Sequence, residues 1–190
     1  CLYYYIKLLM NHVFTINECN EIINDGITDY YVEKAKTQVI KYLETENIIL
    51  SDQKYLTHMV SRSSTSSAKS WHYDNVSVIN FIIMIKGTGT KILSDGKIKE
   101  LQQGYGYMVV GEEGYKFLNI KPTLHCAPKS DDNRLLLKIM LCANFNLSDY
   151  VFGDCVCSYN SPEYNIRNEK LDLMLEQDME IVNSLISRNI

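Results

Sequence analysis

The sequence predicts a mainly β protein with flanking helices, which is the α+β class. The β prediction depends on a series of short apolar and β-branched segments separated by turn signals such as Ser94-Asp95-Gly96. Several short strands at this spacing are typical of a sandwich or a barrel. Helical periodicity on either side of these segments predicts the flanking helices. The expected strands span residues 76–85, 90–93, 98–101, 105–110, 115–120, 124–126 and 134–143.

The helices are predicted from caps and from the spacing of apolar residues. Thr15 and Glu18 match a capping box, so a first helix is expected to begin after Thr15 and to stop near Gly26. Residues 30–46 have an amphipathic pattern and predict a second helix. We expect both to brace one outer face of the β region. Residues 164–190 predict one long helix or two shorter ones, with a possible role in dimerisation.

Composition limits the classes of function. The chain has 190 residues, of which 46% are hydrophobic and 22% are charged, values that are ordinary for a globular domain. Its formal net charge of −4 argues against broad binding to nucleic-acid phosphates. No run of 18 apolar residues is present, so no membrane span is expected.

The cysteines indicate the expected compartment. They are scattered and lack the CxxC spacing of zinc sites. Free thiols in a reducing compartment are the simplest interpretation, so we expect a cytoplasmic protein. The six positions are Cys1, Cys19, Cys126, Cys142, Cys155 and Cys157.

A polar, serine-rich stretch spans residues 61–70, immediately before the first segment with metal-ligand character. We expect a flexible surface loop here. A second interpretation is a lid that orders over substrate, since mobile loops often gate active sites.

The pattern with the most chemical content is His72-Tyr73-Asp74, followed by His125 and Arg134. Side chains at i and i+2 of an extended strand point to the same side, so His72 and Asp74 can reach one metal ion. His125 comes 53 positions after His72 (125 − 72), so it must arrive on another strand that returns beside the first. Two imidazoles and one carboxylate on one face leave open positions, which is the arrangement of non-heme Fe(II) oxygenases.

Arg134 comes nine positions after His125 (134 − 125). That distance allows a short turn and a return strand over residues 134–141. An arginine at the start of such a strand can lie deep in the same barrel and bind a carboxylate bidentately.

These residues resemble the motif of the 2-oxoglutarate and Fe(II)-dependent dioxygenase superfamily, which is His-x-Asp/Glu, a distal His, and an Arg or Lys on the following strand. The resemblance is clearest over residues 70–142. The prolyl-hydroxylase-like branch is most similar, because His72-Tyr73-Asp74 has its common form and residues 13–19 are similar to the start of its first helix. Two departures leave the subfamily open: Gln103-Gly104 replaces the usual Pro-Gly, and Arg134 stands where many collagen-type members have Lys.

The resemblance implies a double-stranded β-helix (jelly-roll) core. It places the whole chain, residues 1–190, in one dioxygenase domain. Within that domain, residues 1–60 would give N-terminal helical support, residues 70–145 the jelly-roll core, and residues 160–190 a C-terminal helical segment.

The resemblance also implies the cofactors and the residues that hold them. Fe(II) would be bound by the catalytic residues His72, Asp74 and His125. The co-substrate 2-oxoglutarate would be held by Arg134 through its distal carboxylate, and Asn80 and Thr90 are candidates to share that carboxylate.

The implied activity is hydroxylation of an amino-acid side chain, peptidyl or free, or of a small metabolite. The conversion of 2-oxoglutarate and O2 to succinate and CO2 would accompany it. The expected partners are 2-oxoglutarate, O2 and an unidentified peptidyl or small-molecule substrate. Neither a membrane nor a nucleic acid is expected, and the chain would be a monomer or a homodimer.

Other interpretations of the same residues remain open. His-x-Asp triplets arise by chance, His125 alone would be typical of a core histidine, and Arg134 alone of a strand-edge charge. A cupin-like metalloenzyme without 2-oxoglutarate is possible, although cupins usually use more His ligands and Arg134 would then be unexplained. A non-catalytic jelly-roll binding module is the third interpretation. Metal content separates the binding module from both enzymes, and 2-oxoglutarate dependence separates the two enzymes.

Overall fold

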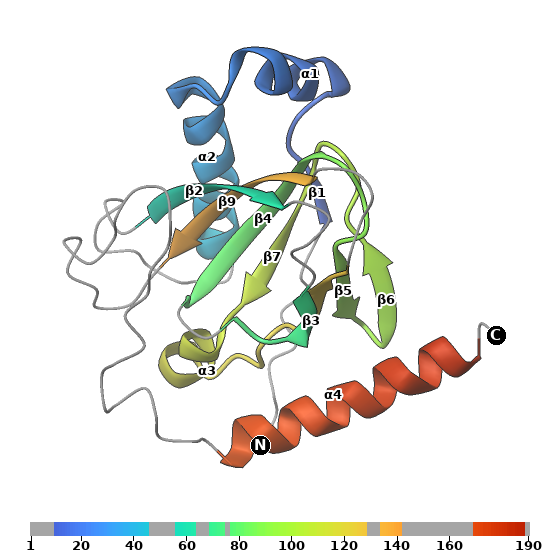
Figure 1. The fold of residues 1–190 in the computed structure, drawn as a ribbon. Helices are drawn as coiled ribbons and strands as arrows, with labels where there is room; N and C mark the ends of the chain where they lie inside the picture. The colour runs from blue at the N-terminus through green and yellow to red at the C-terminus, as the bar shows by residue number, and fades with distance from the viewer. Residues whose placement is uncertain are drawn as a thin grey trace.

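Two antiparallel sheets form the centre of the protein in the computed structural model (Figure 1). The structure describes residues 10–45, 56–63, 69–74, 77–128, 134–141 and 169–188. The major sheet has five strands in the order β1-β7-β4-β9-β2, and the minor sheet has four in the order β3-β8-β5-β6. The predicted mainly β class with flanking helices is therefore confirmed.

The elements have the following bounds. The strands of the major sheet are β1 (Met10–His12), β2 (Leu56–Ser63), β4 (Ile79–Lys86), β7 (Tyr105–Val110) and β9 (Arg134–Leu141). Those of the minor sheet are β3 (Lys69–His72), β5 (Lys91–Ser94), β6 (Lys97–Glu100) and β8 (His125–Ala127). The helices are α1 (Ile16–Asp25), α2 (Asp29–Thr45), α3 (Glu112–Leu118) and α4 (Glu169–Ser187).

The central strands are buried on both faces, which explains their continuous apolar sequence. In β4 every residue except the last, Lys86, is buried. Phe81 and Ile83 belong to an outer cluster with the helices, whereas Ile82 and Met84 belong to an inner cluster between the two sheets. The inner cluster also contains Ile92 of β5, so the sheets pack face to face.

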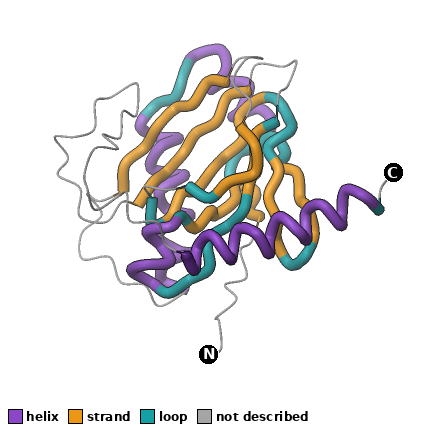
Figure 2. Tube along the Cα trace, turned by 60° about the horizontal axis from the view of Figure 1, so that its bottom comes forward, coloured by secondary structure: helices purple, strands orange, loops and turns teal. Residues whose placement is uncertain are grey.

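Helices cover the outside of each sheet. The outer cluster of the major sheet joins α1 and α2 to β4 and β9, which confirms that these helices brace one face of the β region. A third cluster joins α4 to residues of the minor sheet. Figure 2 shows α4 on the opposite side of the strands from α1 and α2. Among the described residues, no helix is long and apolar enough to cross a membrane.

The start of α1 follows the predicted capping box. The Thr15 hydroxyl accepts a hydrogen bond from the Glu18 backbone N–H at 3.2 Å, and the Glu18 carboxylate accepts one from the Thr15 N–H at 2.8 Å. The helix ends at Asp25, before Gly26 with a φ of 93°. A positive φ at this position favours glycine.

The strand predicted over residues 115–120 is wrong, because the structure has the helix α3 there. The aromatic residues of this segment favour a strand, but its ends carry helix signals. Glu112 and Glu113 lie in the first turn, where acidic side chains favour a helix N-terminus, and Asn119 ends the helix in the left-handed conformation.

The two ends of the serine-rich stretch lie in strands and not in the predicted loop. Residues 61–63 complete β2, and residues 69 and 70 begin β3, whereas residues 64–68 lie outside the described residues.

The first 60 residues supply β1 and part of β2 in addition to helices. The C-terminal segment forms the single helix α4 over its described part.

The capping box gives a direct test of the fold. Thr15→Ala removes the acceptor of the Glu18 N–H, so the free energy of unfolding should fall by about 1 kcal/mol in urea denaturation. Thr37→Ala is the matched control: Thr37 is exposed within α2 and its hydroxyl bonds only the Glu33 carbonyl, so little or no loss is expected. An equal loss in both variants would contradict the role of the cap.

Candidate metal centre

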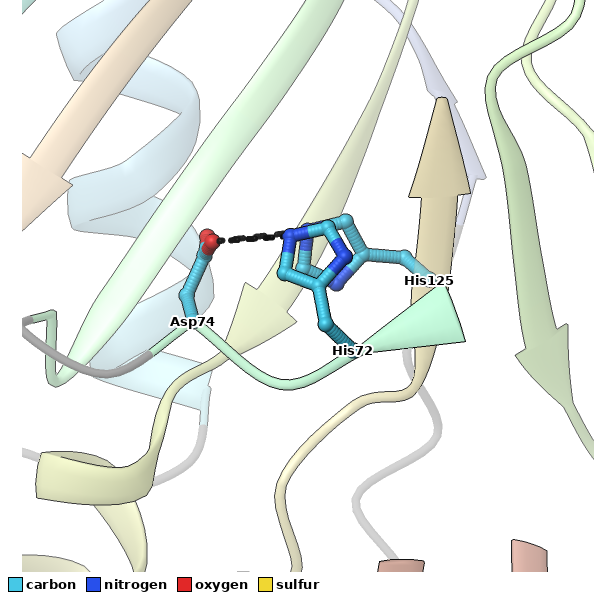
Figure 3. A group of neighbouring side chains, drawn as sticks. All are labelled: His72, Asp74 and His125. Atoms are coloured by element: carbon cyan, nitrogen blue, oxygen red, sulfur yellow. Dashed lines mark ion pairs between the residues drawn. The ribbon is translucent and has the colours of Figure 1, made fainter. Parts of the chain in front are cut away.

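Three predicted ligands converge between the two sheets (Figure 3). The Nε2 atom of His72 lies 3.6 Å from Asp74 Oδ1, and the Nε2 atom of His125 lies 3.5 Å from the same oxygen. The two rings are 4.4 Å apart between centroids. One ligand atom from each residue lies within 4.8 Å of the others, so a single ion can contact all three.

Strand pairing brings the two histidines together. His72 ends β3 and lies directly opposite His125 of β8 in the antiparallel register. Directly opposite residues share a face and have neighbouring side chains. Thr123 anchors the segment before β8, because its N–H donates to the Val110 carbonyl at 2.9 Å and its hydroxyl accepts from the Val110 N–H at 3.0 Å.

Asp74 lies just beyond β3 and is held by the start of α3. Its backbone carbonyl accepts a hydrogen bond from the Glu112 N–H at 2.8 Å. Gly111 makes this approach possible: a Cβ added there would lie 2.0 Å from the Ser77 carbonyl oxygen and 2.8 Å from that of Asp74. The helix that replaces the predicted strand therefore positions one of the three ligands.

Both histidines present Nε2 to the centre because Nδ1 is engaged elsewhere. His72 Nδ1 lies 2.7 Å from the Ser70 carbonyl oxygen, and His125 Nδ1 lies 3.1 Å from that of Thr123. A carbonyl oxygen only accepts, so each Nδ1 carries the proton and donates it. Nε2 then keeps its lone pair for a metal, and the backbone fixes the tautomer of each ligand.

The Asp74 carboxylate is suited to bind a cation. Burial raises the pKa of this carboxyl, but without a metal the hydrogen bonds from the facing His125 and His72 rings more than offset that effect and hold the pKa well below its ordinary value. Its other oxygen, Oδ2, accepts a hydrogen bond from Asn80 Nδ2 at 2.8 Å. A charged carboxylate beside two imidazoles is a donor set that fits Fe(II).

Comparison with known proteins shows the fold. No family model matches the chain, and no curated protein matches it. A viral collagen prolyl hydroxylase from Paramecium Bursaria Chlorella virus-1 superposes with a TM-score of 0.53 at 12% identity, over 73% of this chain and 90% of that one. A prolyl-4-hydroxylase from Pseudomonas putida superposes with a TM-score of 0.52 at 13% identity, over 74% of this chain and 87% of that one.

The chain has the prolyl-hydroxylase fold. Its two antiparallel sheets form the double-stranded β-helix that the sequence predicts. At this level of identity the likeness concerns the backbone, so the roles of individual residues depend on their own contacts.

Arg134 lies inside this prolyl-hydroxylase fold at the start of β9. It is 1% exposed, and its Nη2 donates to the carbonyl of Ala127, two residues beyond His125, at 3.3 Å. Burial lowers the pKa of the guanidinium, which nevertheless stays charged at neutral pH. The arginine is therefore tied to the strand that carries one of the histidines.

Two glycines make room for this arginine. Gly87 has a φ of 92°, and a Cβ added to it would lie 2.9 Å from Arg134 Cγ and 3.1 Å from its Cα. Gly89 also has a φ of 92°, and its added Cβ would lie 3.7 Å from Arg134 Nη1. The glycines that end the apolar run of β4 thus lie against the predicted anion-binding residue.

Thr90 and Asn80, the two candidates to share the carboxylate of 2-oxoglutarate, have different surroundings in the structure. Thr90 is buried next to Gly89, and its hydroxyl has no hydrogen-bond partner among the described residues, so it can still donate to an anion. Asn80 instead uses its amide to hold Asp74. Its role as a contact of 2-oxoglutarate stays a prediction.

Sequence reasoning missed Lys138. Lys138 pairs with Ile82 of the inner cluster and lies on the same face of β9 as Arg134, and its charge also lowers the pKa of Asp74. The two-residue alternation counted from Arg134 could have placed it inside the barrel. No pattern in the sequence predicts the hydrogen bond from the Glu112 N–H to the Asp74 carbonyl, because it joins segments 38 positions apart (112 − 74).

The contact between Asn80 and Asp74 can be separated from the predicted role of Asn80 toward 2-oxoglutarate. Asn80→Leu keeps the branched shape of the side chain and removes the donor, so the metal affinity measured without 2-oxoglutarate should fall by about 10- to 100-fold. Competition with a chelator under anaerobic conditions would measure this affinity. An unchanged metal affinity with weaker 2-oxoglutarate binding would instead support a direct contact with the co-substrate.

Proposed function

We propose that this protein is an Fe(II) and 2-oxoglutarate-dependent oxygenase that hydroxylates an amino-acid side chain, peptidyl or free, or a small metabolite. The observation that carries the proposal is the convergence of His72, Asp74 and His125 inside the barrel, with both Nε2 atoms available and the carboxylate ionised. The buried Arg134 at the start of β9, in the facing major sheet, adds the charge that a dicarboxylate co-substrate needs.

Each residue has a task in this proposal. His72, Asp74 and His125 would hold the metal and leave its remaining positions for co-substrate and O2. Fe(II) bound there would supply the redox chemistry that couples conversion of 2-oxoglutarate and O2 to succinate and CO2 with hydroxylation of a C–H bond. The backbone carbonyls of Ser70 and Thr123 keep both imidazoles in the ligand tautomer and orientation.

Arg134 would bind and orient the distal carboxylate of 2-oxoglutarate. A planar guanidinium offers two parallel N–H donors to a carboxylate, and burial excludes competing water. Thr90 would donate its hydroxyl to the same carboxylate, because this buried group has no hydrogen-bond partner among the described residues. Together the two side chains would fix the co-substrate at one end, so that its other end reaches the metal.

The substrate is proposed as a class of molecule and not as one compound. Two solved structures that share the fold are named prolyl hydroxylases, one of them of collagen, so a peptidyl side chain is the first class to screen. Free amino acids and small metabolites come next. We also propose that residues 1–190 form one domain, a monomer or homodimer in the cytoplasm. The buried free thiols of Cys19 and Cys126 are compatible with a reducing compartment.

The first experiment is an anaerobic titration of the metal-free protein with Fe(II) and then with 2-oxoglutarate. The expected result is a weak visible charge-transfer band that needs both components and is absent from His72→Ala. Iron binding without a band that depends on 2-oxoglutarate would favour the cupin-like enzyme. No metal binding at all would leave a jelly-roll binding module.

Arg134 gives the second test of the proposal. Arg134→Ala should weaken 2-oxoglutarate binding by about 10-fold or more, because a charge-assisted bidentate contact is lost, while the metal affinity stays close to that of the wild type. Titration of the iron-loaded protein with 2-oxoglutarate would measure it. Arg62→Ala is the control, since Arg62 is an exposed arginine of β2. An unchanged affinity for 2-oxoglutarate in Arg134→Ala would contradict the assignment.

A further inference from the structure

The residues that alternate with the metal ligands point out of the barrel toward α4. Trp71 and Tyr73 flank His72 in the sequence, and Leu124 precedes His125. All three pack in one cluster with the buried face of α4, formed by Leu171, Met174 and Val182. The C-terminal helix therefore lies directly behind the segments that carry the ligands.

The buried face of α4 contains one acidic residue. Asp178 lies four positions after Met174 and four before Val182, so it occupies the same face of the helix. It is 4% exposed, although acidic side chains are seldom so buried without a partner. Burying an unpaired carboxylate costs free energy of folding, so the groups that pair with Asp178 indicate its role.

Asp178 has two partners, one on each ligand-bearing segment. The Tyr73 hydroxyl donates to Asp178 Oδ2 at 2.8 Å, and Lys121 Nζ lies 2.5 Å from Asp178 Oδ1. Tyr73 lies between His72 and Asp74. Lys121 lies four positions before His125, on the segment whose Thr123 carbonyl accepts from the His125 ring. One carboxylate thus joins both segments from outside the barrel.

This arrangement limits how the ligands can move. His72 and Asp74 face inward, so Tyr73 offers the only side chain of that tripeptide that α4 can hold. The hydrogen bond from the Tyr73 hydroxyl to Asp178 therefore holds this tripeptide against the helix. A shift of Tyr73 would change the separation of His72 Nε2 and Asp74 Oδ1 directly.

We propose that Asp178 is a positioning residue for the metal centre, acting through Tyr73 and Lys121 to hold the three ligands in register. The proposal rests on the proposed function, because it assumes that His72, Asp74 and His125 bind a metal. It predicts that α4 contributes to metal affinity and not only to stability. None of its atoms needs to contact the metal or the substrate for this role.

The test uses the affinity for Co(II), measured by competition with a chelator at a temperature well below unfolding. Asp178→Asn keeps the shape and removes the charge, and Tyr73→Phe removes only the hydroxyl. Each should weaken Co(II) binding by about tenfold, the lower end of the loss seen when groups that orient metal ligands are removed. The double variant should lose less than the sum of the two single losses, because part of the effect of Asp178 is transmitted through the Tyr73 hydroxyl.

Leu171→Ala is the matched control, since it removes packing of the same helix and leaves the carboxylate in place. It should lower the thermal midpoint of the metal-free protein without changing the affinity for Co(II). If Asp178→Asn fails to fold, Tyr73→Phe decides the question. Wild-type affinity in the folded single variants would overturn this inference alone. A wild-type protein that binds no Co(II) would overturn the proposed function as well.

Discussion

The alternation of side chains along the strands is the constraint on which the core and the candidate centre both depend. Successive residues of a strand point to opposite faces. In β4 the result is an outer cluster under α1 and α2 and an inner cluster between the sheets. In β3 and β8 the same rule turns His72 and His125 inward and leaves their neighbours to pack against α4. A shift of one residue in either strand would exchange these roles.

The candidate centre is held by the backbone as much as by side chains. The carbonyls of Ser70 and Thr123 orient the two imidazoles, and the N–H of Glu112 holds Asp74. Backbone groups that belong to strands and helix ends cannot rotate freely, so the ligands are already oriented before a metal binds. This preorganisation lowers the conformational-entropy cost of metal binding. It also explains why Gly111 and Gly87, which carry no functional group, lie beside functional residues.

Much of the β region could be predicted because its signals are local. The segment 105–110 has the bounds of β7, and the capping box at Thr15 begins α1 as expected. The prediction was wrong at residues 115–120, where the aromatic residues favour a strand and the ends favour a helix. Packing decided between these local preferences, since a Cβ on Gly114 would lie 2.4 Å from the Val78 carbonyl oxygen and the helix backbone approaches the sheet closely there.

The sequence by itself determined the ligand types and their order, because the i, i+2 spacing of His72 and Asp74 and the positions of His125 and Arg134 are properties of the chain. Only the tertiary structure decided that Asn80 donates a hydrogen bond to Asp74 and that Asp178 accepts one from Tyr73, 105 positions away. The physical reason is the distance along the chain over which each interaction acts. Strand alternation and caps act over a few residues, whereas these hydrogen bonds form between segments that meet only after the sheets and α4 have packed.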